Sequence, residues 1–494
     1  MWSENARSAT RRGVTENVHE ATEMTFQKSR DDVARTVVSM LPRLRERLGE
    51  RVVTSLAVRE HHSHGEAVPD ASLPDVVVFP LDNDEVAFVA RQCFDAGVPL
   101  IPFGTGTSLE GHVVAVHGGV CVDLSRMDRV LDVSPDALDC RVQAGVTREQ
   151  LNAEIRAQGL FFPIDPGANA SLGGMASTRA SGTAAVRYGT MRDAVLGLTV
   201  VTADGRIVRT GTRARKTAAG LDLTRLFVGS EGILGIVTEL QLRLWGLPEV
   251  VQAAVCQFPD LGAAVGVVIN ALQMGVPVAR IEVLDDVQMD ACIRYSRLDE
   301  FKPLPTLFIE FHGSPGAVRE QVETMQSLAE DAGGSGFTWA ERPEDRSRLW
   351  KARHECYHAN MALKPGGALI GTDACVPISA FVDCVLETRD DVLASGLVAP
   401  LAGHAGDGNF HLGIVFDPKD ADERARAEAL AERVAMRAIR HGGTCTGEHG
   451  IGLHRIHQLQ AEHGEAVELM RAIKHALDPR GIMNPGKMLP PEPH

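Results

Sequence analysis

Hydrophobic and polar residues alternate along this chain in short runs whose period changes several times. Residues 76–79 form a β-branched run that Pro80 ends, and residues 98–103 form a second short apolar run. Between them, residues 84–96 carry apolar side chains at helical spacing and are followed by Gly97. This order of strand, amphipathic helix and strand predicts a β-α-β start for the first domain.

The later pattern predicts an α+β fold in several parts. Residues 195–209 are expected to form a hairpin around Asp204-Gly205. After Pro248 strands and helices alternate, which indicates a second α+β domain. We therefore expect four parts: a helical segment over 1–70, a first domain over 71–248, a second domain over 249–425 and a C-terminal segment over 426–494 that returns to the first domain.

Composition excludes several classes of protein. The chain has 494 residues, of which 44% are hydrophobic and 23% charged, as in ordinary soluble proteins. Its formal net charge of −15 argues against binding to nucleic acid or to an anionic membrane. No apolar run reaches the roughly 20 residues of a membrane span. Nine scattered cysteines indicate reduced thiols, so we expect a cytoplasmic protein; a peripheral location at the inner membrane and a homodimer are left open.

Three glycine-rich segments are the first candidates for a binding site. Glycine lets a backbone approach a ligand closely, and consecutive N–H groups can bind a phosphate. No lysine follows as in a P-loop, and no GxGxxG opens a long helix. One such loop alone is as often a simple turn, but three together favour a large flat ligand. The candidate residues are Gly104, Thr105, Gly106, Thr107, Ser108 and Gly111, then Pro166, Gly167, Ser171, Leu172, Gly173, Ala176, Gly182 and Thr183, then Glu231, Gly232, Gly235, Ile236 and Val237.

These segments carry a resemblance. PFGTGTSLEG, DPGANASLGGMASTRASG and GSEGILGIVT look like the FAD-binding domain of the vanillyl-alcohol-oxidase-type (PCMH-type) flavoproteins, and within these like cytochrome-linked D-lactate dehydrogenases and glycolate oxidase D subunits. The resemblance implies FAD bound across residues 71–248, with Val186 and Tyr188 nearby and Asn484 closing over the flavin. It also implies a ferredoxin-like substrate or cap domain over 249–425. Thr107 stands where some relatives carry a flavin-linking histidine, so we expect noncovalent FAD.

A group of histidines and acids in the C-terminal half is a candidate metal site. His404 and His411 are seven residues apart across a Gly-Asp-Gly turn, and Glu448 lies between glycine and histidine. Two imidazoles and one carboxylate suit Zn²⁺, Mn²⁺ or Fe²⁺ with open positions for a substrate. Among 18 histidines, such a pair alone is more often a surface feature. The family resemblance implies that these three residues are the ligands of a divalent metal, zinc or manganese.

Oxidation of a 2-hydroxy acid requires removal of the hydroxyl proton and transfer of the C2 hydride, here to flavin N5. The resemblance makes His449 the base, although it could instead only orient Glu448. It also makes Arg353 the group that binds the substrate carboxylate, with surface solvation as the alternative. Asn409, from the first histidine motif, completes the expected catalytic residues.

The identity of the substrate is the most specific of these expectations. Relatives that oxidise 2-hydroxyglutarate carry an extra lysine where this chain has Gly371, so a small D-2-hydroxy acid such as D-lactate is favoured. Electrons would pass to cytochrome c, a quinone or an electron-transferring flavoprotein. The alternatives are a glycolate oxidase D-type subunit, a D-2-hydroxyglutarate dehydrogenase, a flavin-dependent transferase and, in another class, a metallohydrolase without flavin.

Overall fold

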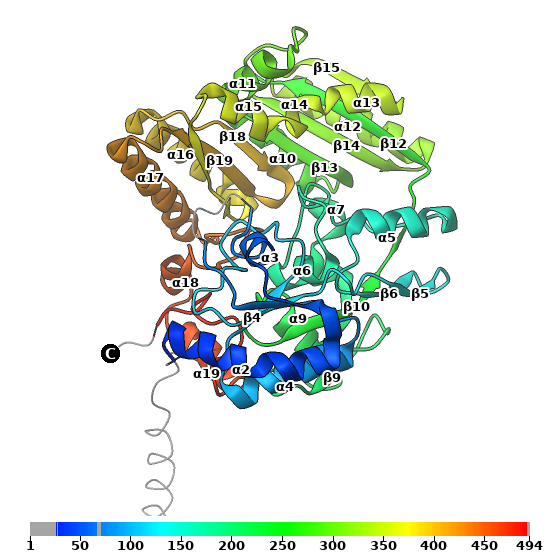
Figure 1. Ribbon diagram of the computed structural model, residues 1–494. Coiled ribbons are helices and arrows are strands. Elements are labelled where there is room, and N and C mark those ends of the chain that lie inside the picture. The colour runs from blue at the N-terminus through cyan, green and yellow to red at the C-terminus, as the bar shows by residue number, and fades with distance from the viewer. Residues whose placement is uncertain (1–25, 27, 67–70, 492–494) are drawn as a thin grey trace, which may run out of the picture.

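The computed structural model describes residues 26, 28–66 and 71–491. They form two lobes, each with its own hydrophobic core (Figure 1). The first core takes its residues from positions 33–244 and from Ile482 and Met483, and the second from positions 254–438. Of the predicted N-terminal helical segment, residues 1–25 lie outside the described part. The remainder forms α2 (Arg30–Leu48), η1 (Gly49–Arg51), β1 (Val52–Val53) and α3 (Leu56–His61).

A small, mostly parallel sheet begins the first lobe. Its strand order is β1-β2-β4-β3, with β2 (Val76–Val78), β3 (Leu100–Phe103) and β4 (Val120–Asp123), and only β1 runs antiparallel. Helix α4 (Asn83–Ala96) connects β2 to β3; Asp82 caps its first turn and Gly97 ends it in a left-handed conformation. The predicted β-α-β unit is therefore confirmed.

An antiparallel sheet of order β5-β6-β10-β8-β9 completes the first lobe. Strands β8 and β9 pair as the predicted hairpin. Thr147 caps the helix that Gly159 ends, as the N- and C-terminal signals of its sequence require. Strands β7 and β11 pair as a separate two-stranded sheet. The elements of this part of the first lobe are β5 (Val130–Ser134), β6 (Asp139–Gln143), α5 (Arg148–Ile155), η2 (Arg156–Gln158), β7 (Leu160–Phe161), α6 (Leu172–Thr178), α7 (Ala185–Tyr188), α8 (Met191–Ala194), β8 (Val195–Val201), β9 (Ile207–Arg209), α9 (Leu223–Phe227), β10 (Ile236–Arg243) and β11 (Trp245–Gly246).

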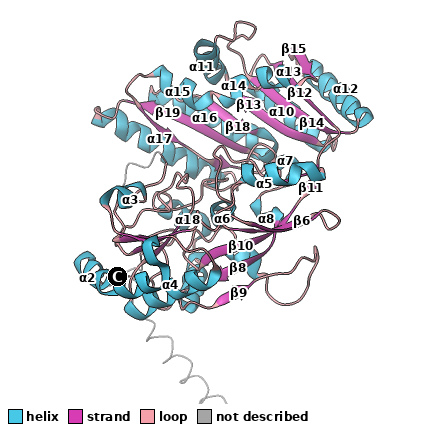
Figure 2. Ribbon diagram, turned by 45° about the vertical axis from the view of Figure 1, so that its right-hand side comes forward, coloured by secondary structure: helices cyan, strands magenta, loops and turns pink. Residues whose placement is uncertain are grey.

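A large sheet of order β15-β12-β14-β13-β18-β19-β16 forms the second lobe, and β17 pairs with β19 (Figure 2). Both of its faces are covered: Ala254 and Cys256 of β12 belong to one core cluster, while Ala253 and Val255 belong to another. This is the two-residue period of a strand buried on both sides. The strands are β12 (Val250–Gln257), β13 (Val278–Leu284), β14 (Thr306–Gly313), β15 (Ser335–Ala340), β16 (Ala368–Gly371), β17 (Ala374–Cys375), β18 (Leu401–His404) and β19 (Asn409–Phe416).

The helices of this lobe divide between the two faces. Helix α10 packs against both α12 and α16, and α11 packs against α14 and α15 (Figure 1). They are α10 (Leu261–Gln273), α11 (Asp286–Ser296), α12 (Pro315–Asp331), α13 (Pro343–Leu349), α14 (Lys351–His354), α15 (Cys356–Leu363), η3 (Ile378–Ala380), α16 (Phe381–Ser395), η4 (Ala405–Asp407) and α17 (Ala421–Arg440).

The predicted boundary between residues 425 and 426 falls inside α17. Ala427, Leu430, Val434 and Ala438 of this helix pack into the second core, so the chain leaves that lobe only after Arg440. It then forms α18 (Ile456–His463) and α19 (Ala466–Leu477) and reaches the first lobe. There Met483 bridges to Leu100 of β3. Within the described residues, no helix combines the length and apolarity needed to cross a membrane.

Candidate active site between the two lobes

A cleft of about 1760 Å³ is lined by residues of both lobes and of the C-terminal segment. All three glycine-rich segments reach it, and so do the predicted metal ligands, His449 and Arg353. The predicted cofactor residues that line it are Gly104, Thr105, Gly106, Thr107, Ser108, Pro166, Gly167, Ser171, Gly173, Gly182, Thr183, Glu231, Gly232, Gly235, Val237 and Asn484. The tertiary structure thus brings segments more than 300 residues apart to one cavity.

Six predicted cofactor residues do not line this cleft. Leu172 and Ala176 lie on the face of α6 that packs into the first core, while Gly173, Gly174 and Ser177 line the cleft. The other four are Gly111, Val186, Tyr188 and Ile236. Gly111 lies against Leu453, and Val186 lies beside Gly406. The Tyr188 hydroxyl lies 2.7 Å from His312 Nδ1, and Ile236 is buried in the first core. For α6, the sequence predicted the whole glycine-rich segment as a binding site, but it did not show which face of the helix is turned to the core.

The glycines of the cleft are required by close approach. A Cβ on Gly104 would lie 2.3 Å from Ser171 Oγ, and one on Gly182 would lie 2.4 Å from the Asp165 carbonyl oxygen. Both distances are far below van der Waals contact, so side chains are excluded where the first segment meets the second and where the two ends of the second segment meet. A surface made of backbone, small side chains and hydroxyl groups suits a flat, phosphate-bearing ligand.

Glu231 and Asn484 hold the C-terminal segment against the glycine segments. The Glu231 carboxylate accepts hydrogen bonds from the Ile451 and Gly452 amides at 2.7 and 2.8 Å. Asn484 Nδ2 donates to the Glu231 carbonyl at 2.8 Å, and Asn484 Oδ1 accepts from Lys487 at 2.7 Å. Both side chains border the cleft, and their hydrogen bonds fix the wall that the C-terminal segment adds to it.

His404 and His411 converge on one carboxylate oxygen. In the β18–β19 pair, Ala402 lies opposite His411 and His404 opposite Asn409, so the two histidines are diagonal neighbours on one face. Their Nε2 atoms lie 3.3 and 3.4 Å from the same oxygen of Glu448. The seven-residue spacing therefore brings both imidazoles to one point, as the sequence predicted.

The second nitrogen of each imidazole is held by the protein. His404 Nδ1 lies 2.8 Å from Glu282, and His411 Nδ1 lies 3.0 Å from the Thr372 carbonyl oxygen. Metal-binding histidines have this arrangement, because the bond at one nitrogen sets the ring for coordination through the other. The donor set of His404, His411 and Glu448 therefore fits a divalent metal.

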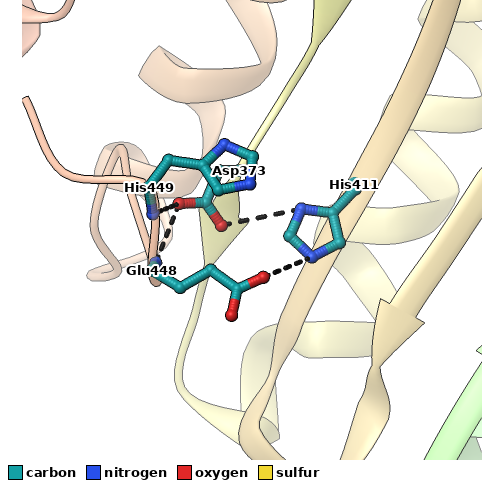
Figure 3. A group of neighbouring side chains, drawn as sticks. All are labelled: Asp373, His411, Glu448 and His449. Atoms are coloured by element: carbon teal, nitrogen blue, oxygen red, sulfur yellow. Dashed lines mark hydrogen bonds and ion pairs between the residues drawn. The ribbon is translucent and has the colours of Figure 1, made fainter. Parts of the chain in front are cut away.

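Asp373 also lies close to this group, beside His411, Glu448 and His449 (Figure 3). Its Oδ2 accepts from the backbone amides of Glu448 and His449, both at 2.8 Å, and its Oδ1 accepts from Asn409 Nδ2 at 2.9 Å. With both oxygens used in this way, Asp373 is a support for the loop and not a free ligand. Asn409 donates to Asp373 and lines a small pocket beside His404, outside the main cleft, and its catalytic role stays a prediction.

Charges within the group perturb its pKa values strongly. Burial lowers the pKa of His411 to about 4. Burial acts in the same direction on His404, but the Glu282 and Glu448 carboxylates outweigh it and raise the pKa of His404 well above its ordinary value. Burial raises the pKa of Glu448, yet His404 outweighs it and the net value falls to about 2. Buried carboxylates thus surround the imidazoles, which favours a bound cation.

His449 lies at the junction of the two lobes. Its ring stacks on that of His411, with centroids 5.5 Å apart and planes at 13°. Its Nδ1 lies 3.7 Å from Glu110 of the first glycine segment, and Glu110 also accepts from Arg455 Nε at 2.8 Å. Burial lowers the pKa of His449, but Asp373 and Glu110 outweigh it, so the net pKa is raised.

Arg353 faces the cleft from α14. Its Nε donates to Glu282 at 2.8 Å. Burial lowers its pKa, but the Glu282 carboxylate outweighs this and raises it, so the guanidinium stays charged. Four charged residues of this site were not predicted from the sequence as site residues: Glu110, Glu282, Asp373 and Arg455. Each is a single charged residue without a motif of its own, although Glu110 lies within the first glycine segment.

A two-lobed cleft with glycine-rich walls and a buried cluster of histidines and carboxylates fits a flavin-dependent oxidoreductase. Residues 74–211 match the model described as "FAD binding domain", and residues 247–488 match "FAD linked oxidases, C-terminal domain". The chain belongs to this family of FAD-linked oxidases. The resemblance inferred from the glycine segments and the assignment of FAD as cofactor are confirmed.

Two curated relatives cover most of the chain. A protein of Danio rerio named "Probable D-lactate dehydrogenase, mitochondrial" is 53% identical over 89% of this chain and 89% of its own length. An Arabidopsis thaliana protein named "D-lactate dehydrogenase [cytochrome], mitochondrial" is 42% identical over 99% of this chain and 86% of its own. The fold is also that of 4-ethylphenol oxidase from Gulosibacter chungangensis, with a TM-score of 0.75 at 18% identity over 92% of this chain and 97% of that one. The predicted α+β fold of the PCMH type is therefore confirmed.

Proposed function

We propose that this FAD-linked enzyme oxidises D-lactate to pyruvate, with His449 as the base and a divalent metal at His404, His411 and Glu448. The observation that carries the proposal is the convergence of two histidine Nε2 atoms on one Glu448 oxygen, next to His449 and inside the FAD cleft. The names of the two relatives, at 53% and 42% identity, support the substrate.

The donor atoms of His404, His411 and Glu448 support a divalent metal at this site. Zinc and manganese both accept imidazole nitrogen and carboxylate oxygen. A divalent ion held there would act as a Lewis acid and lower the pKa of a hydroxyl group that it binds. Ser181 Oγ donates to the second oxygen of Glu448 at 3.0 Å, which holds this carboxylate toward the two imidazoles.

The proton and the carboxylate of the substrate each have a partner in the protein. His449 Nδ1 is turned toward Glu110, so its Nε2 is the atom that takes the proton of the C2 hydroxyl. Arg353 offers its two Nη atoms to the carboxylate, a geometry that favours paired hydrogen bonds. Bound FAD supplies the acceptor for the C2 hydride.

The absence of a side chain at position 371 favours a substrate with a single carboxylate. Gly371 lines the cleft at the end of β16, and a Cβ placed there would meet nothing within 4 Å. This position offers no cation to a second carboxylate, which disfavours 2-hydroxyglutarate. For the electron acceptor we propose cytochrome c, in keeping with the name of the Arabidopsis thaliana relative.

Anaerobic reduction of the flavin tests the function. The purified protein, loaded with zinc or manganese, is mixed with D-lactate, L-lactate, glycolate or D-2-hydroxyglutarate, and the flavin absorbance is followed. We expect D-lactate to bleach the flavin fastest. Fastest bleaching by glycolate would favour a glycolate oxidase subunit, and a protein that none of these acids reduces would contradict the proposal.

A further inference from the structure

Glu282 is a completely buried carboxylate between two groups of the proposed active site. It lies on β13, in the run Arg280-Ile281-Glu282-Val283-Leu284, with 0% of its surface exposed. Its side chain contacts His404 on one side and Arg353 on the other. Burying a charge raises the free energy of the folded state unless charged or hydrogen-bonding partners compensate for it. The position of Glu282 among apolar residues therefore indicates a role for its partners.

The sheet places Glu282 beside His404. The antiparallel register of β13 and β18 pairs Val283 with Gly403 and Leu284 with Ala402. Continuing this register by one residue brings Glu282 next to His404. Both carboxylate oxygens then lie within 2.9 Å of His404 Nδ1, which leaves Nε2 directed at Glu448.

The same carboxylate orients Arg353. Glu282 Oε2 accepts from Arg353 Nε at 2.8 Å. Within the described part of the chain, the two Nη atoms of Arg353 have no hydrogen-bond partner, and the residue lines the cleft. The bond at Nε therefore fixes the plane of the guanidinium and leaves its two terminal nitrogens for a ligand.

We propose that Glu282 is a positioning residue that sets the arrangement of the metal site relative to the group that binds the substrate carboxylate. This inference rests on the proposed function and deepens it. A 2-hydroxy acid carries its hydroxyl and carboxylate on adjacent carbons, so the two protein groups that receive them must keep a fixed spacing. One rigid side chain on a central strand, bonded to both, provides that spacing.

Three variants separate positioning from charge balance. Glu282→Gln keeps the shape but removes the charge and one acceptor oxygen. Glu282→Asp keeps the charge but is one methylene shorter, so it cannot bond both partners at once. Glu310→Gln on the neighbouring strand β14 is the matched control, because Glu310 is also a buried carboxylate but pairs with His312 and Arg280 instead.

Two measurements on the FAD-loaded protein give the readouts. Zinc affinity is measured by competition with a chelator, and KM and kcat are measured with D-lactate and an artificial electron acceptor. For Glu282→Gln and Glu282→Asp we expect zinc affinity to fall about 10- to 100-fold, as for other partners of metal-binding histidines. We also expect KM for D-lactate to rise about tenfold. Glu310→Gln should keep its zinc affinity, and all variants should keep their FAD.

A double variant tests the link to the arginine. If Glu282 acts on the substrate through Arg353, adding Glu282→Gln to Arg353→Met should raise KM little further, because the shared effect is already lost. Full recovery of zinc affinity and KM in Glu282→Asp would reduce Glu282 to charge balance and overturn the inference. Unchanged zinc affinity and KM in Glu282→Gln would overturn it as well.

The two proposals fail in different ways. A wild-type protein that binds zinc but is not reduced by any 2-hydroxy acid would overturn the proposed function alone. In that case a weaker zinc affinity in Glu282→Gln would still support the positioning of His404. A wild-type protein that oxidises D-lactate while Glu282→Gln matches it in both measurements would overturn the present inference alone.

Discussion

The imidazole of His449 stacks on that of His411, with ring centroids 5.5 Å apart and planes at 13°. His411 comes from a central strand of the second lobe, and His449 from the C-terminal segment that returns to the first. The proposed base is thus in direct contact with a proposed metal ligand. A change at either ring is expected to affect proton removal without disturbing the glycine-rich wall of the cleft.

Replacing His449 by alanine should remove most of the turnover and leave FAD bound. A positioned general base contributes roughly 10²- to 10⁴-fold to the rate. We expect kcat with D-lactate to fall within this range, while the ratio of flavin to protein absorbance stays at the wild-type value. The exposed His475 gives a control, since His475→Ala should change neither quantity. Loss of FAD in His449→Ala would mean that this residue holds the cofactor instead.

Glu110→Gln should slow the reaction by acting on His449. Glu110 lies 3.7 Å from His449 Nδ1, and its charge also balances Arg455. We expect kcat to fall roughly tenfold, part of what a base contributes, with KM nearly unchanged. The double variant Glu110→Gln/Arg455→Met separates the two roles. If Glu110 only neutralised Arg455, this variant would recover the wild-type kcat.

Gly182→Ala should weaken FAD binding, whereas Gly246→Ala, outside the cleft, should not. A Cβ on Gly182 would lie 2.4 Å from the Asp165 carbonyl oxygen, while one on Gly246 would meet nothing within 4 Å. Relieving such an overlap costs about 1–3 kcal/mol and shifts the backbone of the cleft wall. Thermal unfolding and the fraction of retained FAD measure the effect. Equal behaviour of the two variants would contradict the close-approach argument.

Asp285 should make the protein less stable as the pH rises from about 4 to 7. Burial raises the pKa of its carboxyl to about 7 in the folded state, well above the usual value near 3.8. Between these values Asp285 binds more protons in the folded state than in the unfolded state, so its contribution to stability is greatest at low pH and falls on the way to pH 7. The slope is roughly 1 kcal/mol per pH unit.

Asp285→Asn provides the comparison. Asparagine can still accept the hydrogen bonds that Asp285 Oδ1 receives from the Gln288 and Leu401 amides. The variant should therefore gain stability over the wild type above pH 7 and lose this advantage near pH 4. Melting temperatures of both proteins across this pH range check it, and parallel curves would show that Asp285 does not titrate there.

Local signals along the chain predicted the elements well. Helix α4 ends at Gly97 and strands β8 and β9 form a hairpin, as the pattern of polar and apolar residues predicted. The boundary placed at residue 425 failed for a physical reason. The apolar stripe of α17 shows that the helix is buried, but not which core receives it.

Some residues of the candidate site could also be predicted from local sequence, whereas others could not. His404, His411, Glu448 and His449 belong to short motifs, and glycines marked the cleft wall, so the residues could be named from sequence and family resemblance. Glu282 and Asp373 were not recognised from any motif or from flanking glycines. Their roles depend on hydrogen bonds to His404 and Arg353, and to the amides of Glu448 and His449, which are distant in sequence.

Helix capping, hydrophobic periodicity and glycine-rich composition are local properties, so the secondary structure and the glycine segments could be predicted from the chain alone. Which of these residues meet depends on the tertiary fold. The pairing of β13 with β18 sets Glu282 beside His404, and the return of the C-terminal segment sets His449 over His411. Such contacts depend on strand register and lobe packing, which join residues 122 positions apart in the first case and 38 in the second.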